Sequence, residues 1–284
     1  MAKNYRAELV AVFGDPVDDN PTGAIEEAAF AALGLNYRYL TVRVLPEALG
    51  AAIAGARAFH MKGFNLTMPH KIRVIPFLDG LTDAARLIGA VNTVYLENDR
   101  LIGENTDGKG FVEALISEGV DLTGKQITLL GAGGAARAIG VECALAGAKR
   151  VDVINRNRER GLELSRLISS KTSAQSSYLP WEGTAKIPEG TQILINGTCV
   201  GLAPNGHERP DIDYQAISEG MVVADVVFNP ENPPFLREAA ARGAKTITGL
   251  GMLACQAARN FTLWTGEKAP LELMKDALRA EFAQ

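Results

Sequence analysis

The sequence predicts an α/β fold of two domains, and three observations support that prediction. Short apolar runs alternate with helical patterns along most of the 284 residues, as in proteins built from parallel strands and covering helices. The length suits about two domains. A glycine-rich turn, Gly131-Ala132-Gly133-Gly134-Ala135, lies between an apolar run and an alanine-rich helical pattern.

The first half of the chain has the order strand, helix, strand, helix, strand, which predicts parallel strands with right-handed crossovers. Pro46 opens the second helix at a position that tolerates proline. Residues 84–89 are expected to form a turn, and a turn at Asn98-Asp99 is expected to join two further strands. The expected strands are 7–13, 37–44, 64–67, a strand from about 90 and 101–103, and the expected helices are 24–33, 46–58 and 109–118.

The second half alternates strand and helix, again as expected for a parallel sheet. Its strands are expected at 127–130, 151–154, 193–196, 222–227 and 245–248, with a short one near Tyr178, and its helices from the glycine turn to Gly147 and at 159–168 and 234–241. Two last helices, 252–264 and 271–282, are expected to return to the first domain. The domain bounds are therefore 1–107, completed by 250–284, and 108–249, with residues 119–125 as the best linker candidate.

The glycine-rich turn has the strand, turn and helix order of a dinucleotide site. Gly131 permits the tight turn, Gly133 lets backbone N–H groups approach a pyrophosphate, and Ala136 allows close packing of helix on strand. The phosphates then lie at the positive end of the helix. The second domain is therefore predicted to be a Rossmann-type, doubly wound cofactor domain.

The end of the next strand indicates which dinucleotide is bound. An NAD site usually places an acidic residue there, but this chain has Asn155, Arg156 and, one helical turn later, Arg160. Guanidinium groups suit a 2′-phosphate, so NADP is predicted and NAD is the alternative. Without the glycine turn, a solvated charge run opening a helix would be the better interpretation.

The bulk composition argues against several other classes. A net charge of −4 and a pI near 5.6 give no support to nucleic-acid binding. Cys143, Cys199 and Cys255 are far apart, so they predict neither disulfides nor a metal site, and they are interpreted as small buried side chains. No stretch predicts a signal peptide or a membrane span, so we expect a cytoplasmic protein, monomer or homodimer, without a membrane partner.

Five blocks of residues, in order, resemble shikimate dehydrogenases and their quinate/shikimate relatives over essentially the whole chain. They are Asn65-x-Thr67-x-Pro69-x-Lys71, Gly89-Ala90-Val91-Asn92-Thr93, Asn105-Thr106-Asp107-Gly108, Gly131-Ala132-Gly133-Gly134-Ala135 and Gly249-x-Gly251-Met252-Leu253-x-x-Gln256-Ala257. The resemblance implies an NADP-dependent oxidoreductase that interconverts shikimate and 3-dehydroshikimate, with a place in aromatic amino acid (chorismate) biosynthesis and no metal.

The resemblance also implies the roles of individual residues. Lys71 matches the catalytic lysine and Asp107 its partner carboxylate, which suits the proton transfer that alcohol oxidation needs. Positions that bind the hydroxyl groups of a cyclic polyol are matched by Asn65, Thr67, Asn92 and Gln256. Positions that contact the cofactor are matched by Gly131, Ala132, Gly133, Gly134, Ala135, Asn155, Arg156, Arg160, Thr198, Val226 and Gly249.

The resemblance fails at the positions that hold the substrate carboxylate. Asn20 and Thr22 replace two serines, Glu26 replaces a histidine and Phe228 replaces a tyrosine. Asn20 and Thr22 can still donate hydrogen bonds to a carboxylate, but Phe228 cannot. The alternatives are therefore shikimate held by a rearranged set of donors, or quinate or another cyclic polyol with a different substituent at that end. A rival of another class is a non-catalytic NADP-binding regulator, against which Lys71 and Asp107 argue.

Overall fold

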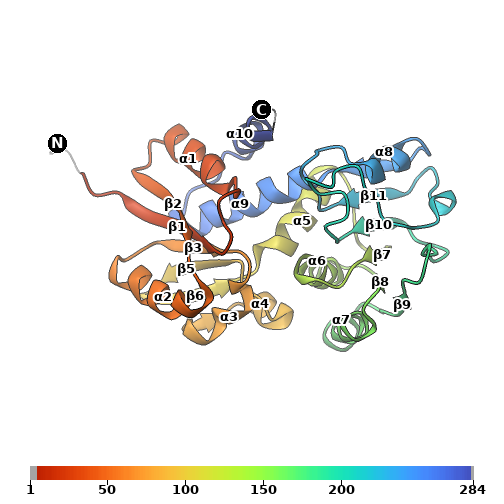
Figure 1. Ribbon diagram of the computed structural model, residues 1–284, viewed down its shortest axis with the longest axis horizontal. Coiled ribbons are helices and arrows are strands. Elements are labelled where there is room, and N and C mark those ends of the chain that lie inside the picture. The colour runs from red at the N-terminus through yellow and green to blue at the C-terminus, as the bar shows by residue number, and fades with distance from the viewer. Residues whose placement is uncertain (1–4, 283–284) are drawn as a thin grey trace. The chain divides into compact units, whose positions relative to one another are not determined.

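The computed structural model describes residues 5–282 and divides the chain into two compact units (Figure 1). The first unit contains the chain up to Thr106 and again from Gln256 onward, and the second contains Asp107–Cys255. Residues 119–125, expected to be the linker, lie inside the second unit, because the helix before them already belongs to it.

The first unit is built on a mixed sheet with the strand order β2-β1-β3-β5-β6-β4. The strands are β1 (Glu8–Gly14), β2 (Tyr37–Arg43), β3 (Gly63–Leu66), β4 (Gly80–Leu81), β5 (Thr93–Glu97) and β6 (Arg100–Glu104). β1, β2 and β3 are parallel, as predicted, and β5 runs antiparallel to both β3 and β6. The predicted turn between β5 and β6 is confirmed, with φ of 51° at Asn98 and 60° at Asp99.

Helices cover this sheet. They are α1 (Thr22–Ala32), α2 (Leu49–Ala58), α3 (His70–Arg73), α4 (Asp83–Ile88), the later part of α9 (Gly249–Thr265) and α10 (Leu271–Phe282), and 3₁₀ turns span Pro46–Ala48 and Ile75–Phe77. The expectation of a simple turn at 84–89 is wrong. The Thr82 hydroxyl accepts a hydrogen bond from Ala85 N at 3.2 Å and Gly89 ends the segment at a φ of 74°, so both ends of a short helix are capped.

The return of the last helices to the first unit is visible in aromatic contacts. Phe30 of α1 stacks on Phe261 of α9 with ring centroids 5.4 Å apart. The indole nitrogen of Trp264 donates to Val94 O at 3.0 Å, and a Cβ on Gly63 would lie only 2.2 Å from that nitrogen. The end of α9 therefore packs directly on the central strands.

The second unit has a fully parallel sheet with the order β12-β11-β10-β7-β8-β9. The strands are β7 (Gln126–Leu130), β8 (Arg150–Asn155), β9 (Tyr178–Pro180), β10 (Ile193–Asn196), β11 (Val222–Asp225) and β12 (Lys245–Ile247). Numbered within the unit, this is the doubly wound order 6-5-4-1-2-3, which confirms the predicted Rossmann-type fold. The order reverses between β7 and β10, where ligands of such sheets bind.

The helices of this unit are α5 (Thr106–Ser117), α6 (Gly134–Leu145), α7 (Arg158–Lys171), α8 (Pro234–Ala240) and the first part of α9. Cys143 and Cys255 are buried as expected, whereas Cys199 is exposed, because it follows the end of β10 in a surface turn. None of the helices within residues 5–282 has both the length and the apolar character of a membrane span.

Candidate functional site

The loop between β7 and α6 has the features of a phosphate-binding turn. Gly131 has a φ of 105°, a conformation that favours glycine, and a Cβ there would lie 2.9 Å from Thr198 Cγ2. A Cβ on Gly133 or Gly134 would meet no atom of the described chain within 4 Å. The backbone at the start of α6 is therefore open to a ligand.

The start of α6 also favours an anion. Among the described residues no side chain caps this end, and no acidic residue lies in the first helical turn. Its N–H groups and the positive end of the helix dipole can therefore bind phosphate oxygens. Close packing of the helix behind the turn comes from Ala136, which is fully buried, as predicted from the sequence.

The end of β8 presents the residues expected to read the adenosine end of the cofactor. Asn155 Nδ2 donates to Asn157 O at 2.7 Å, and the Asn157 side chain caps α7 by accepting from Arg160 N at 3.0 Å. Arg156 is exposed, and its guanidinium carbon lies 5.3 Å from the centre of the Trp181 ring. This cation–π contact restrains Arg156 while leaving its N–H donors available.

The ends of β10 and β11 hold the residues expected on the nicotinamide side. Asn196 Oδ1 accepts from the Thr198 hydroxyl at 2.6 Å, and Asn196 Nδ2 donates to Asp225 Oδ1 at 2.9 Å. Val226 N donates to Asn196 O at 3.1 Å. A Cβ on Gly249 would lie 2.5 Å from Val226 O, so only glycine allows this approach of the two backbones. The structure thus brings Thr198, Val226 and Gly249 together around Asn196.

Asp225 is a functional candidate that the sequence reasoning missed. It is fully buried at the end of β11, and burial raises the pKa of its carboxyl to about 7, with the hydrogen bonds from Val227 N and Asn196 opposing that shift. Its Oδ2 has no hydrogen-bond partner within residues 5–282. The sequence signal that could have identified Asp225 is its position directly before Val226, a predicted cofactor contact.

In the first unit, polar side chains from β3, the segment before β5, the start of α5 and α9 form one hydrogen-bonded network. Asn65 Nδ2 donates to Asn92 O at 3.2 Å, and Asn92 Nδ2 donates to Gln256 Oε1 at 3.0 Å. Asn92 Oδ1 accepts from Thr106 N at 2.7 Å, and the Thr106 hydroxyl donates to Asn260 Oδ1 at 2.8 Å. Three predicted substrate residues are therefore neighbours, and Thr106 and Asn260 extend the set.

The start of α1 is connected to the same network through Tyr39, which the sequence reasoning did not single out. Tyr39 Oη donates to Asn65 Oδ1 at 2.8 Å. Burial and the charge of Glu26 raise the pKa of Tyr39, and the nearby Thr22 side chain opposes them. In the sequence, only the alternation of apolar and polar residues along β2 indicated that Tyr39 is buried.

The two predicted catalytic residues lie near the starts of two helices, α3 and α5. Lys71 is half-buried on α3, directly after Thr67 and Pro69, and its backbone O accepts from Val91 N at 2.7 Å. Asp107 is buried in the first turn of α5, one residue after Thr106. Val91, the neighbour of Asn92 in the chain, thus bonds to Lys71. Thr106, the neighbour of Asp107, bonds to Asn92.

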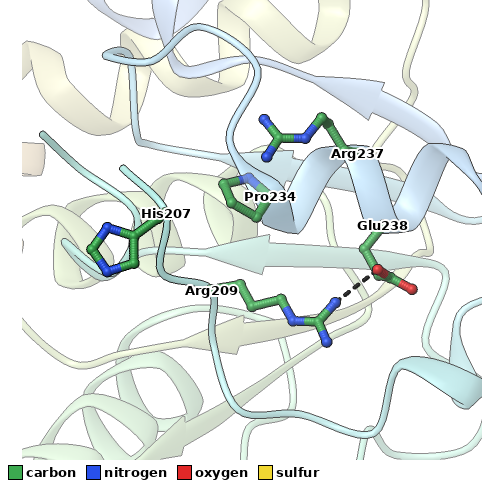
Figure 2. A pocket seen from close by; sticks show the side chains of 5 residues that line it. All are labelled: His207, Arg209, Pro234, Arg237 and Glu238. Carbon is green, nitrogen blue, oxygen red and sulfur yellow. Dashed lines mark hydrogen bonds and ion pairs between the residues drawn. The ribbon is translucent and has the colours of Figure 1, made fainter. Parts of the chain in front are cut away.

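One surface hollow lies outside all of these residues. It has a volume of about 380 Å³ and is lined by His207, Arg209, Pro234, Arg237 and Glu238 in the second unit (Figure 2). Glu238 pairs with Arg209 at 2.7 Å and also with Arg242, so its carboxylate offsets much of the local positive charge. None of the five belongs to the predicted site.

The doubly wound sheet, the open glycine turn and the arginines after β8 define a dinucleotide-dependent oxidoreductase, and the residues present fit NADP. Family models describe residues 12–94 as a shikimate dehydrogenase substrate binding domain and residues 249–279 as a shikimate 5'-dehydrogenase C-terminal domain. The NADP(+)-dependent shikimate dehydrogenase of Desulforamulus reducens is 41% identical over 99% of this chain and 98% of its own. The chain belongs to the shikimate dehydrogenase family.

Two solved structures show how the family likeness extends to different substrates. The ligand-free 5-ketofructose reductase of Gluconobacter sp. strain CHM43 matches with a TM-score of 0.94 and 41% identity, over 98% of this chain and 99% of its own. A shikimate dehydrogenase in complex with NADP+ matches with a TM-score of 0.91 and 37% identity, over 99% and 98%. Reductases of a ring acid and of a keto sugar are thus similar to this chain to nearly the same degree.

Proposed function

We propose that the chain is an NADP-dependent oxidoreductase that transfers hydride reversibly between the nicotinamide and a secondary hydroxyl group of a polyhydroxylated ring. The network of Asn65, Asn92 and Gln256 is the observation that supports it most, because neutral amides that converge in one place suit a polyol. Shikimate, which the names of the relatives give, and its ketone 3-dehydroshikimate are the first substrate pair.

Lys71 and Asp107 are the proposed proton-transfer pair. In the oxidation direction the Lys71 amine takes the hydroxyl proton while the carbon beneath becomes a ketone, and in reduction Lys71 returns that proton. Asp107 orients the amine and hydrogen-bonds the same hydroxyl group. When bound, NADP supplies the hydride acceptor or donor. The backbone bond from Val91 N to Lys71 O supports a fixed position for the base.

NADP is the proposed cofactor because Arg156 and Arg160 follow β8 where an NAD enzyme places a carboxylate. Charge-assisted hydrogen bonds from guanidinium to a 2′-phosphate are about twice as strong as neutral ones. The open backbone at Gly133 and Gly134 supports pyrophosphate binding at the start of α6.

A second candidate is the oxidation of quinate or of another ring compound with a changed substituent at the end remote from Lys71. The replacement of the carboxylate-binding residues favours it, since Phe228 cannot donate a hydrogen bond. The similarity to a 5-ketofructose reductase points the same way, because that name describes a sugar substrate rather than a ring acid.

A panel of ring polyols tests the proposal. Shikimate, quinate and uncharged cyclic polyols are assayed for NADPH and NADH formation, and 5-ketofructose and 3-dehydroshikimate for NADPH consumption. Turnover of at least one compound with NADP, at a higher kcat/KM than with NAD, is expected. NADPH binding without turnover of any compound would identify the chain as a regulator instead.

A further inference from the structure

Two buried polar side chains face each other across the ends of neighbouring strands in the second unit. Asn196 ends β10, Asp225 ends β11, and the two residues are partners in the register of the parallel sheet. Both are fully buried, and Asn196 Nδ2 donates to Asp225 Oδ1 at 2.9 Å. We call them the Asn196–Asp225 pair. It lies at the carboxyl ends of the strands, the edge at which doubly wound sheets bind their ligands.

The Asn196 amide organises the loop that follows β10. Its Oδ1 accepts from Thr198 N at 3.1 Å and from the Thr198 hydroxyl at 2.6 Å. Because a backbone N–H is always a donor, the first of these bonds fixes the orientation of the amide. Its Nδ2 therefore faces Asp225 and also donates to Val200 O at 3.2 Å. The Asn196 side chain thus uses both of its N–H groups and both lone pairs of its oxygen within the second unit.

The Asp225 carboxyl organises the loop that follows β11. Besides the bond from Asn196, its Oδ1 accepts from Val227 N at 2.9 Å. The backbones of the two loops are bonded as well, since Val226 N donates to Asn196 O at 3.1 Å and Gly249 N donates to Val227 O at 3.2 Å. The pair therefore joins the segments that carry three predicted contacts on the nicotinamide side, Thr198, Val226 and Gly249.

The loop after β10 also packs against the phosphate-binding turn. Gly197 N donates to Leu130 O at 2.9 Å, and a Cβ on Gly131 would lie 2.9 Å from Thr198 Cγ2. Thr198 thus lies between the Asn196 amide and the glycine turn. Loss of the amide bonds would leave Thr198 held from one side only.

The pair is costly to bury, which indicates a role other than packing. Asp225 Oδ2 has no hydrogen-bond partner within residues 5–282, and burial raises the pKa of this carboxyl to about 7. A buried polar atom without a partner is unfavourable, and well-packed apolar side chains in place of a buried polar pair are often neutral or stabilising. Apolar side chains, however, could not bind the backbone N–H groups of Thr198 and Val227. Holding these two loops is what only the polar pair supplies.

We propose that Asn196 and Asp225 are positioning residues for the nicotinamide half of NADP. Because both side chains are fully buried, they act through the loops that they hold rather than by touching the cofactor. The inference rests on the proposed function and adds two residues to its cofactor site. The adenosine half is assigned to residues after β8, so loss of the pair is expected to weaken the binding of one half of the cofactor and not of the other.

Two ligands separate the halves of the cofactor. NADP+ contains the nicotinamide, whereas 2′,5′-ADP contains only the adenosine half, and the dissociation constants of both are measured by calorimetric titration of the full chain. Asp225→Ala is expected to raise the ratio of the NADP+ constant to the 2′,5′-ADP constant by about three- to tenfold, as for one lost hydrogen bond. Asp225→Asn keeps the Oδ1 acceptor and is expected to return the ratio close to the wild-type value. An unchanged ratio in folded Asp225→Ala, including equal losses for both ligands, overturns the inference.

A matched control separates positioning from stability. Asp152 on β8 is 5% exposed, and it too accepts from a backbone N–H, that of Ser177 at 3.1 Å, and from a side chain, Arg150 Nε at 2.6 Å. Asp152→Ala is expected to lower the stability of the unit and to leave the ratio of the two constants unchanged. A rise equal to that in Asp225→Ala contradicts the inference.

Two further outcomes are also decisive. Asn196→Ser breaks the pair from the other strand, so it replaces Asp225→Ala if that variant does not fold: a raised ratio supports the inference and an unchanged ratio overturns it. If the wild-type chain binds both ligands but converts none of the panel compounds, the proposed function fails, and the ratio in the variants still decides the role of the pair.

Discussion

The two units differ in the groups that they offer to their predicted ligands: backbone in the second unit and hydrogen-bonded side chains in the first. In the second unit the recognition surface is backbone, since Gly133 and Gly134 leave open space at the start of α6. In the first unit the candidate groups are side chains that already bond to one another, from Tyr39 through Asn65 and Asn92 to Gln256.

This difference has a consequence for specificity. A backbone cradle accepts any pyrophosphate, so the choice of cofactor falls to the few side chains after β8. A network of bonded side chains has donors and acceptors of fixed direction, and a ligand must complement them or leave buried groups unpaired. Cofactor class therefore follows from a motif, whereas substrate class follows from hydrogen-bond direction.

The largest expected effect is the loss of kcat in Lys71→Ala, which distinguishes a role in catalysis from a role in cofactor binding. Lys71→Ala removes the proposed base, so kcat is expected to fall by roughly 10²–10⁴-fold, the usual contribution of general acid–base catalysis. The dissociation constant of NADPH, measured by fluorescence titration, is expected to stay the same. A variant that keeps wild-type kcat would show that proton transfer uses another group.

The buried carboxyl of Asp225 is expected to make stability depend on pH. Its pKa is about 7 in the folded chain against an ordinary 3.8, so the contribution of this group to stability is complete below about pH 4 and is lost as pH rises through 7. Asp225→Asn keeps the Oδ1 acceptor for Asn196 and Val227 and removes this loss. Urea unfolding should show the variant more stable at pH 8, by a few kcal/mol at most, and equal to wild type near pH 4.

The arginines after β8 are expected to distinguish the two dinucleotides. Arg156→Ala removes a guanidinium from the proposed 2′-phosphate site, so the NADPH dissociation constant should rise by about ten- to a hundredfold, as for one hydrogen bond to a charged group. NADH binding should change little. Arg166→Ala, at an exposed position on the following helix α7, is the control. Equal losses for both cofactors would place the 2′-phosphate elsewhere.

Adding a methyl group at Gly133 tests whether the cofactor approaches the backbone there closely. Gly133→Ala introduces a Cβ that meets no described atom within 4 Å, so the fold should persist while the NADPH dissociation constant rises by about tenfold. Gly55→Ala, whose Cβ would make an ordinary 3.8 Å contact with Phe59 in the first unit, is the control. Unchanged NADPH binding in the Gly133 variant would contradict a close approach of the cofactor.

The smallest expected effect concerns the substrate end. Phe228→Tyr restores a phenol at the position where the family has one, and the kcat/KM for shikimate should rise by about tenfold or less. Methyl shikimate serves as the internal control, since its ester gains less from a donor than a carboxylate does. A similar gain for both compounds would show that the phenol acts on packing rather than on charge.

The cofactor unit was the more predictable from sequence. Its glycine turn and its alternation of strand and helix depend on local patterns, and the predicted doubly wound fold is confirmed. The helix α4 was missed because its caps, Thr82 and Gly89, enclose only six residues, too few for a helical period to be visible.

The bond from Tyr39 to Asn65, beside Thr22 and Glu26, could not be predicted in the same way. Thr22 and Glu26 were singled out only as departures from a family pattern, and Tyr39 has no motif at all. Their meaning depends on pairing across α1, β2 and β3, which brings distant residues within hydrogen-bond reach. The roles of Lys71, Asp107 and the other site residues remain predictions that the variants above test.

The discontinuity of the first unit has a consequence for biosynthesis. Trp264 bonds to Val94 O and Phe261 stacks on Phe30, so the sheet of this unit lacks part of its covering until the last helices leave the ribosome. The second unit is continuous from Asp107 to Cys255 and has no such requirement. Domains fold as units during synthesis. Residues 107–255 are therefore expected to mature before the first unit, whose earlier segment waits for the end of α9 and for α10.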